Sequence, residues 1–549
     1  MTSIIAHPRR FLARGIAALG LALGIGLAAP AAAAELKTGI APYLEVEQVL
    51  SSEFGDGGDT LTYTSIAAGV DGAISTRRVH AQISYRYERR IGWGGDLEDS
   101  DVHTGIAQLS AEVVPETVTI NAGALAARSR VDGRGPIFGF SGADNPNLAD
   151  VYSVYAGPDL STRAGPLQVA ASARLGYVKV DDHGFDDFIL PGASSDRYDS
   201  STQYSLSGSV GMAPGDLPVG WTVGAGYFRE DVNRLDQKFD GYYVRGDLVF
   251  PVSDELALTG GVGYEEIQSS QQDVRRGSDG LPIVTPGGNL IADKSAPRLF
   301  SYDHGGMIWD VGVIWRPSRR TELQARAGER YGSKTFTASL EHKLSGDYAV
   351  SASIYDSVTS FGRVLVNDFS SLPVGFRNNR NPLNPGVGGV GGCIFGSEAG
   401  SGVCLDDALQ SISNSTFRLR GANVVLSGRR GPWELGVGAG YAHRKYHQAV
   451  VAPTLGLERV TDQSFSLFGN ATRRLGRNAS LGFDAYAAWY DSGLAGSDSS
   501  FGTGVSANYY RSFLLDRLEG YAAAALFTTD SGDFDTTGAS AVIGLRYTF

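Results

Sequence analysis

The sequence has little cysteine, little methionine and no long hydrophobic run after its N-terminal region. Only two cysteines and three methionines occur among its 549 residues. A disulfide-rich scaffold is therefore excluded, because it needs many thiol groups. Beyond residue 34 no run of 18 apolar residues occurs, which excludes a mature protein that crosses a membrane with helices. Acidic residues outnumber lysine and arginine, 59 to 47, and this balance argues against a nucleic-acid partner.

Glycine and aromatic residues are abundant instead. The chain has 73 glycines, 25 tyrosines and 24 phenylalanines, without a change of composition that would mark a domain boundary. Its mean hydropathy is slightly negative, at −0.10. A β-barrel in a membrane permits this value because only alternate residues of each strand face lipid.

The last nine residues predict a strand with one apolar and one mostly polar face. Ala541, Ile543, Leu545, Tyr547 and Phe549 are apolar and occupy every second position. A terminal aromatic residue on such a strand resembles the β-signal of bacterial outer-membrane barrels, with Leu545, Tyr547 and Phe549 as its residues. The resemblance implies that the barrel assembly machinery recognises this strand as the closing one.

The N-terminus predicts a cleaved secretory signal peptide over residues 1–34. Three arginines precede an unbroken apolar stretch at 15–27, and small residues up to Ala34 provide a cleavage site. A membrane anchor is the alternative, because the apolar region is long enough to span a bilayer. Alanine and glycine dominate its second half and Pro30 interrupts it, which favours the signal peptide.

Segments with the same alternation recur along the rest of the chain. We expect about 22 strands, within a range of about 18 to 24, each close to the roughly 9–11 residues that cross a bilayer at a tilt. They lie at 41–52, 60–70, 79–90, 102–114, 117–129, 150–160, 167–180, 202–213, 220–231, 241–252, 256–268, 305–316, 322–331, 333–344, 348–358, 415–428, 433–446, 458–473, 479–492, 504–513, 518–528 and 537–549. The predicted fold is all-β: residues 35–549 form a transmembrane, antiparallel, up-and-down β-barrel without a plug domain.

The connections between these strands alternate in length. Links such as 115–116 and 253–255 are short, whereas 181–201, 269–304 and 359–414 are long. Short turns are typical of the periplasmic side of a barrel and long loops of the outer side. TonB-dependent transporters also have about 22 strands, but a large plug domain precedes their barrel. Only a few residues separate Glu35 from the first predicted strand, so that class is not favoured.

Within the predicted strands, apolar and polar residues separate onto opposite faces. A lumen ringed by about 20 strands is too wide to be filled by side chains, so we expect the polar face inside. The predicted lumen-facing residues are Arg86, Arg245, Arg326, Arg330, Arg418, Arg420, Arg444, Asp310 and Glu322. Their mixed signs leave two interpretations open: an influence on passing ions, or cross-strand pairing that neutralises the wall.

Few residues suggest chemistry. Cys393 and Cys404 lie in the long loop 359–414 with ten residues between them, and in an exported chain this pair predicts a disulfide. The eight histidines are scattered over different segments, and no motif ties a serine or an acid to them. We therefore expect no catalytic residues, no metal site and no cofactor. Arginine pairs in the short turns, such as Arg319 and Arg320, suggest contact with lipid headgroups or with a periplasmic partner.

Three stretches resemble a group of outer-membrane barrels linked to PEP-CTERM and exopolysaccharide systems. They are residues 41–50 (APYLEVEQVL), 79–90 (VHAQISYRYERR) and 151–158 (VYSVYAGP). The resemblance implies a non-enzymatic barrel of the Gram-negative outer membrane that forms or supports a passage for exopolysaccharide or another secreted polymer, with loops 269–304 and 359–414 at its mouth. The alternatives are a general diffusion porin for small solutes and an outer-membrane hydrolase.

Overall fold

The structure is a computed structural model. It describes residues 39–54, 60–94, 99–131, 148–182, 198–215, 217–283, 285, 290–377, 381–383, 392–405, 409, 411–447, 461–493, 499–514, 517–531 and 535–549. The predicted signal peptide lies outside these residues, as does most of the predicted loop 181–201.

Twenty-two strands form one antiparallel sheet. They are β1 (Gly39–Phe54), β2 (Thr60–Ser75), β3 (Val79–Gly94), β4 (Ser100–Val114), β5 (Val118–Arg130), β6 (Leu148–Ala164), β7 (Leu167–Asp182), β8 (Ser200–Met212), β9 (Gly220–Val232), β10 (Gln237–Pro251), β11 (Leu256–Gln271), β14 (Leu299–Ser318), β15 (Thr321–Arg330), β16 (Ser333–Lys343), β17 (Tyr348–Thr359), β20 (Thr416–Arg430), β21 (Trp433–His447), β22 (Thr461–Arg474), β23 (Ala479–Asp491), β24 (Ser500–Phe513), β25 (Leu518–Asp530) and β26 (Thr536–Thr548). Each strand pairs with the one that follows it in this order.

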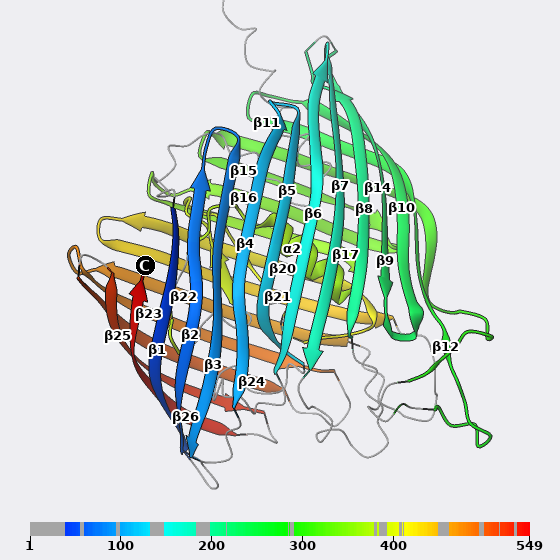
Figure 1. Ribbon diagram of the computed structural model, residues 1–549. Coiled ribbons are helices and arrows are strands. Elements are labelled where there is room, and N and C mark those ends of the chain that lie inside the picture. Colours follow the sequence, from blue (N-terminus) through cyan, green and yellow to red (C-terminus); the bar gives the residue numbers. More distant parts are fainter. Residues whose placement is uncertain are drawn as a thin grey trace, which may run out of the picture.

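The sheet closes on itself because the first strand pairs with the last. The register between β1 and β26 runs from Tyr43 opposite Thr548 to Phe54 opposite Thr537. Figure 1 shows the blue first strands beside the red last ones. Closure leaves no strand of the 22-stranded ring with an unpaired edge, which is the condition for placing strands in a hydrocarbon layer.

Alternate residues along the strands face outward and are apolar. In β1, Leu44 and Val46 are 51% and 52% exposed, whereas Glu45 and Glu47 beside them are buried. Of the residues predicted to form a β-signal, Leu545 and Tyr547 of β26 are 56% and 39% exposed, and Phe549, directly after the strand, is 65% exposed. An apolar outer face on a closed ring is that of an outer-membrane β-barrel. The protein therefore lies in the Gram-negative outer membrane, with its outer face against lipid.

The prediction of an all-β antiparallel sheet is confirmed, and the ring has the predicted 22 strands. Each predicted segment overlaps one observed strand, since the alternation of side chains sets the strand directly. The largest difference is at β14, which begins at Leu299, six residues before the predicted start at 305. The tight link between β15 and β16 consists of Tyr331 and Gly332, whose positive φ values of 55° and 68° fit a two-residue hairpin turn.

The long connections after β11 and after β17 lie in different places relative to the ring. The one after β11 forms a short hairpin of β12 (Asp273–Val274) and β13 (Ala292–Asp293), which projects from the rim away from the ring (Figure 1). The one after β17 contains the helix α2 (Phe361–Ser371) and the hairpin of β18 (Cys393–Phe395) and β19 (Gly402–Cys404). In the described part of the chain, no helix has both the length and the apolar character to cross a membrane.

Candidate functional site

The connection between β17 and β20 folds inside the ring, and we call residues 360–415 the internal segment. Its described parts are 360–377, 381–383, 392–405, 409 and 411–415. α2 lies against the inner faces of β5 to β8, and the β18–β19 hairpin lies against β20 and β21. Figure 1 shows α2 within the ring. The sequence predicts a loop at the mouth of a barrel without a plug, but this stretch is a folded element that occupies the lumen.

The first residue of the internal segment fixes the start of α2. The Ser360 hydroxyl caps the helix by accepting a hydrogen bond from the Arg363 backbone N–H at 3.3 Å. The same hydroxyl donates to the carboxylate of Glu230, which is fully buried on the inner face of β9. This one serine therefore both begins the helix and attaches it to the wall.

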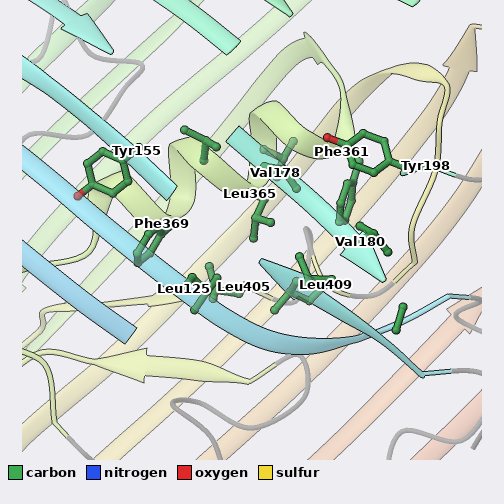
Figure 2. Close-up of a cluster of buried hydrophobic side chains, with 14 of the residues drawn as sticks. Leu125, Tyr155, Val178, Val180, Tyr198, Phe361, Leu365, Phe369, Leu405 and Leu409 are labelled. Atoms are coloured by element: carbon green, nitrogen blue, oxygen red, sulfur yellow. The ribbon is translucent and has the colours of Figure 1, made fainter. Parts of the chain in front are cut away.

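The apolar face of α2 packs on the aromatic and branched residues of the wall (Figure 2). Phe361 meets Tyr198 edge to face, with ring centroids 5.0 Å apart, and Phe369 meets Tyr155 in the same way at 5.2 Å. Val366 lies over Gly176 of β7, where an added β-carbon would come within 3.1 Å of it. Glycine at 176 thus lets the helix approach the strand closely.

Two wall glutamines hold the backbone of the internal segment beyond the middle of α2. The Gln108 amide donates to the Phe369 carbonyl at 3.0 Å and is itself held by the Tyr155 hydroxyl at 2.6 Å. Gln82 of β3 donates to the Phe376 carbonyl at 2.8 Å and accepts from the Phe376 N–H at 3.1 Å. These bonds satisfy backbone groups that an internal helix end would otherwise bury without partners.

A single hydrophobic core crosses the lumen. It joins α2 to the wall at β4–β9 and also to the opposite wall at β20 and β21. Its buried members include Ile106, Leu125, Val151, Val178, Val180 and Val232 on one side, Leu365, Phe376, Ile394, Leu405 and Leu409 in the internal segment, and Phe417, Leu419, Ala442 and Tyr446 on the other side. The segment therefore bridges strands that lie far apart around the ring.

The disulfide predicted from the sequence is confirmed. Cys393 and Cys404 are bonded to each other and are directly paired across β18 and β19. Phe395 of the same hairpin lies against Phe468 of β22, with ring centroids 6.3 Å apart. The bridge holds the hairpin together and places its sulfurs on the inner wall at β21.

Gly438 of β21 lies directly beneath this disulfide. An added β-carbon there would come 2.2 Å from the Cys393 Sγ and 2.6 Å from the Cys404 Sγ. We expect Gly438→Val to loosen the hairpin at a cost of about 1–3 kcal/mol, the usual range for overpacking. The measurement is the rate of limited proteolysis within 392–405, which should rise.

Gly469→Ala on the neighbouring β22 is the matched control, because an added β-carbon there meets nothing closer than 3.9 Å. Combining Gly438→Val with Cys393→Ala and Cys404→Ala removes the colliding sulfurs and should bring no further loosening from the valine. Equal proteolysis of Gly438→Val and the parent would contradict the packing described here.

The charged residues predicted for the lumen form several ion-paired groups. Arg86 contacts Glu45, Glu47 and Glu88 on the inner faces of β1 and β3. Arg245 and Arg326 both contact Asp310, at 2.6 and 2.9 Å. The remaining pairs are Arg330 with Glu265, Arg316 with Glu322, and Arg444 with Asp462.

Arg418 and Arg420 are placed differently. They lie on the face of β20 opposite to Phe417 and Leu419, whose side chains are in the internal core. Both arginines pair with Asp356 of β17, at 2.8 and 3.2 Å. The guanidinium of Arg418 also lies over the ring of Tyr331, 5.4 Å from its centroid.

Sequence reasoning missed the residues that hold the internal segment, namely Glu230, Gln82 and Gln108. A signal for the helix itself was present: Ser360 precedes apolar residues at 361, 364, 365 and 369, which is helical spacing after a favourable N-cap. The many glycine and proline residues of 359–414 favoured the prediction of a loop instead.

No known protein family matches this sequence, and neither does any curated protein. Solved structures of similar architecture include the FrpB iron transporter from Neisseria meningitidis, with a TM-score of 0.47 and 11% identity over 93% of this chain and 82% of that one. The ferric-catecholate import receptor Fiu from E. coli K12 has a TM-score of 0.44 and 10% identity over 92% and 81%. The copper transporter OprC has a TM-score of 0.39 and 13% identity over 93% and 81%.

The function expected from the sequence is wrong. A polymer conduit or a diffusion porin needs a water-filled lumen, but a hydrophobic core crosses this one. The resemblance to barrels of exopolysaccharide systems remains a prediction.

Proposed function

We propose that this protein is a gated outer-membrane transporter for a small ligand. In its resting state the internal segment closes the lumen, and transport requires that segment to move. The observation that carries the proposal is the hydrophobic core that joins α2 and the β18–β19 hairpin to both sides of the ring.

The attachment of the internal segment favours movement without damage to the barrel. In the described residues, β18 and β19 pair with each other and not with the 22-stranded sheet. α2 is attached through side chains such as Glu230 and Gln108. Displacing the segment therefore breaks no hydrogen bond between strands of the ring. Segments held in this way open at lower free energy than closed sheets.

The test is a disulfide that fixes α2 to the wall. We expect Gly176→Cys with Val366→Cys to form a bridge, because an added β-carbon at 176 lies 3.1 and 3.2 Å from the two γ-carbons of Val366. The pair is built in a Cys393→Ser/Cys404→Ser background, so that it is the only thiol pair. Conductance is recorded in planar bilayers with increasing urea.

The oxidised lock should stay closed at urea concentrations where the same protein, once reduced, conducts. The single Gly176→Cys variant is the control and should respond like the unlocked protein in both redox states. Equal currents through the oxidised and reduced lock would overturn the proposed gate.

We infer two partners for this transporter. The barrel assembly machinery would read the outward residues of β26, and a periplasmic partner would dock on the exposed arginines of the short turns. These include Arg77, Arg78, Arg319, Arg320, Arg429, Arg430, Arg473 and Arg474. A partner at the periplasmic end of the ring would be in a position to pull the internal segment toward the periplasm.

A further inference from the structure

Arg363 in the first turn of α2 has no ionic partner among the described residues. Its guanidinium lies over the ring of Phe228 at 3.9 Å from the centroid and reaches the ring of Phe239 at 5.8 Å. The two rings are 5.1 Å apart and come from the inner faces of β9 and β10. The Arg363 Nε is buried and has no hydrogen-bond partner in the described structure. Arginines of the wall such as Arg245 and Arg326 are paired instead.

Arg363 is charged at neutral pH but forms no ion pair among the described residues. Burial lowers the pKa of its guanidinium to about 10, and the nearby charge of Glu230 acts in the opposite direction. The group therefore remains protonated in ordinary conditions. One Glu230 oxygen is occupied by the Ser360 hydroxyl, and no ion pair joins Glu230 to Arg363 in the described residues. A protonated guanidinium held among aromatic rings in this way attracts an anion.

Unpaired polar atoms occur beside the same aromatic cluster. The Tyr302 hydroxyl and the His447 Nε2 are both buried without hydrogen-bond partners in the described structure, and their rings are 4.6 Å apart. Tyr302 and Tyr331 pack on the cluster that contains Phe239. Buried polar atoms are normally paired, so several orphans around one aromatic cluster indicate that a bound molecule completes the site.

This cluster lies where the ends of several strands converge on the inside of the ring. The Thr416 hydroxyl at the start of β20 is 2.8 Å from the Ser269 hydroxyl near the end of β11. Val358 near the end of β17 packs on Phe239 and Ile267. The long connections after β11 and β17 leave the ring at this end.

We propose that Arg363 binds the carboxylate of a small organic anion whose planar, apolar body lies against the aromatic residues around Phe228, Phe239 and Tyr302. The planar guanidinium fork matches a carboxylate in two parallel hydrogen bonds. A phosphate dianion is disfavoured because Arg363 is the cation without a partner here and the neighbouring Arg330 and Arg418 already hold Glu265 and Asp356.

The inference rests on the proposed function and deepens it. Arg363 belongs to α2, so an anion bound there acts on the helix that closes the lumen. Arg363 would therefore bind the ligand and also belong to the element that forms the gate.

The test uses benzoate as the probe and the full chain in detergent, with binding measured by titration calorimetry. Benzoate should bind, and its neutral isostere benzamide and inorganic phosphate should bind at least roughly tenfold more weakly, because only benzoate supplies a single negative charge on an apolar ring. Arg363→Gln should weaken benzoate by a similar factor. Arg316→Gln is the matched control, since Arg316 pairs with Glu322 at 2.5 Å and is remote from the cluster.

Folding of each variant is checked by heat-modifiable gel mobility. If Arg363→Gln does not fold, Arg363→Lys serves instead, and it should lose affinity because a lysine cannot form the paired bonds. Absence of benzoate binding to the parent, or equal binding by the parent and the Arg363 variant, would overturn the site. Equal affinity for benzamide would overturn the role of charge.

Calorimetry separates this inference from the proposed gate. The oxidised Gly176→Cys/Val366→Cys protein should still bind benzoate, since the lock lies further along α2. Binding with no effect of the lock on conductance would leave the site standing and the gate overturned. Loss of benzoate binding in Arg363→Gln with a functional lock supports both.

Discussion

Replacing residues 361–414 with a short glycine–serine linker should convert the closed barrel into an open pore. The ends to be joined are adjacent, because Thr359 of β17 is paired with Phe417 of β20. A hairpin turn therefore replaces the internal segment without a change in any strand of the ring. With the segment removed, no folded element remains between the walls in the described structure, and a 22-stranded ring is too wide for side chains to fill.

The measurement is single-channel conductance in planar bilayers, where we expect a rise of at least roughly tenfold over the full chain. The matched control removes the outer hairpin between Gln271 and Leu299, which are paired at the ends of β11 and β14. That deletion also replaces a long connection by a short turn, but it removes residues outside the lumen. The conductance should therefore stay as low as that of the full chain. A folded 361–414 deletion with unchanged conductance would mean that something else closes the ring.

The ring could be predicted from the sequence because its signal is local. Side chains of a barrel strand alternate between lipid and lumen, so each strand can be identified from its own residues. The alternating lengths of the connections then indicate which strand ends are periplasmic. The closing strand illustrates this well. Ile543 and Leu545 stand two residues apart, and both face outward at 67% and 56% exposure. No knowledge of partner strands was needed to assign them.

The internal segment could not be predicted because its partners come from distant strands. Phe369, for example, packs on Tyr155 of β6 while its carbonyl accepts from Gln108 of β4. The sequence of residues 361–371 does not indicate which strands the helix contacts. The hydrophobic core also changes the meaning of the alternation, since Phe417 and Leu419 point inward while Arg418 and Arg420 lie on the other face. A rule that places every apolar residue on the outer face would therefore assign Phe417 and Leu419 to the lipid side, although both lie in the internal core.

Arg86→Met should destabilise the barrel by about 3–5 kcal/mol, the usual consequence of leaving buried charges without their partner. Arg86 lies 2.8 Å from Glu47 and 3.4 Å from Glu45, and it also contacts Glu88. The side chains of Glu47 and Glu88 are both 2% exposed and that of Glu45 is 9% exposed, so solvent screens little of their repulsion.

The position of this cluster makes the loss a global one. Glu45 and Glu47 belong to β1, which closes the ring against β26, and the Tyr521 hydroxyl of β25 lies 2.6 and 2.7 Å from them, so that its one proton can be donated to either. Without Arg86, the cations that remain beside the three carboxylates in the described structure are Arg90, paired with Glu88, and Arg546, 4.0 Å from Glu45. Repulsion across the first strand then acts directly on the seam that holds the barrel closed.

The measurement is urea unfolding in detergent followed by tryptophan fluorescence, with Arg316→Met as the matched control. Arg316 pairs with Glu322, whose side chain is 25% exposed, so its loss should cost about 1 kcal/mol or less. Adding Glu47→Gln to Arg86→Met removes one of the repelling charges and should recover part of the stability, with a coupling of about 1–3 kcal/mol in a double-mutant cycle. Additive effects, or an Arg86→Met protein as stable as the control, would show that the cluster is not held by its arginine. Because the carboxylates are buried on the inner face of the first strand, recovery by Glu47→Gln would also show that repulsion, and not lost packing of the arginine stem, opens the seam.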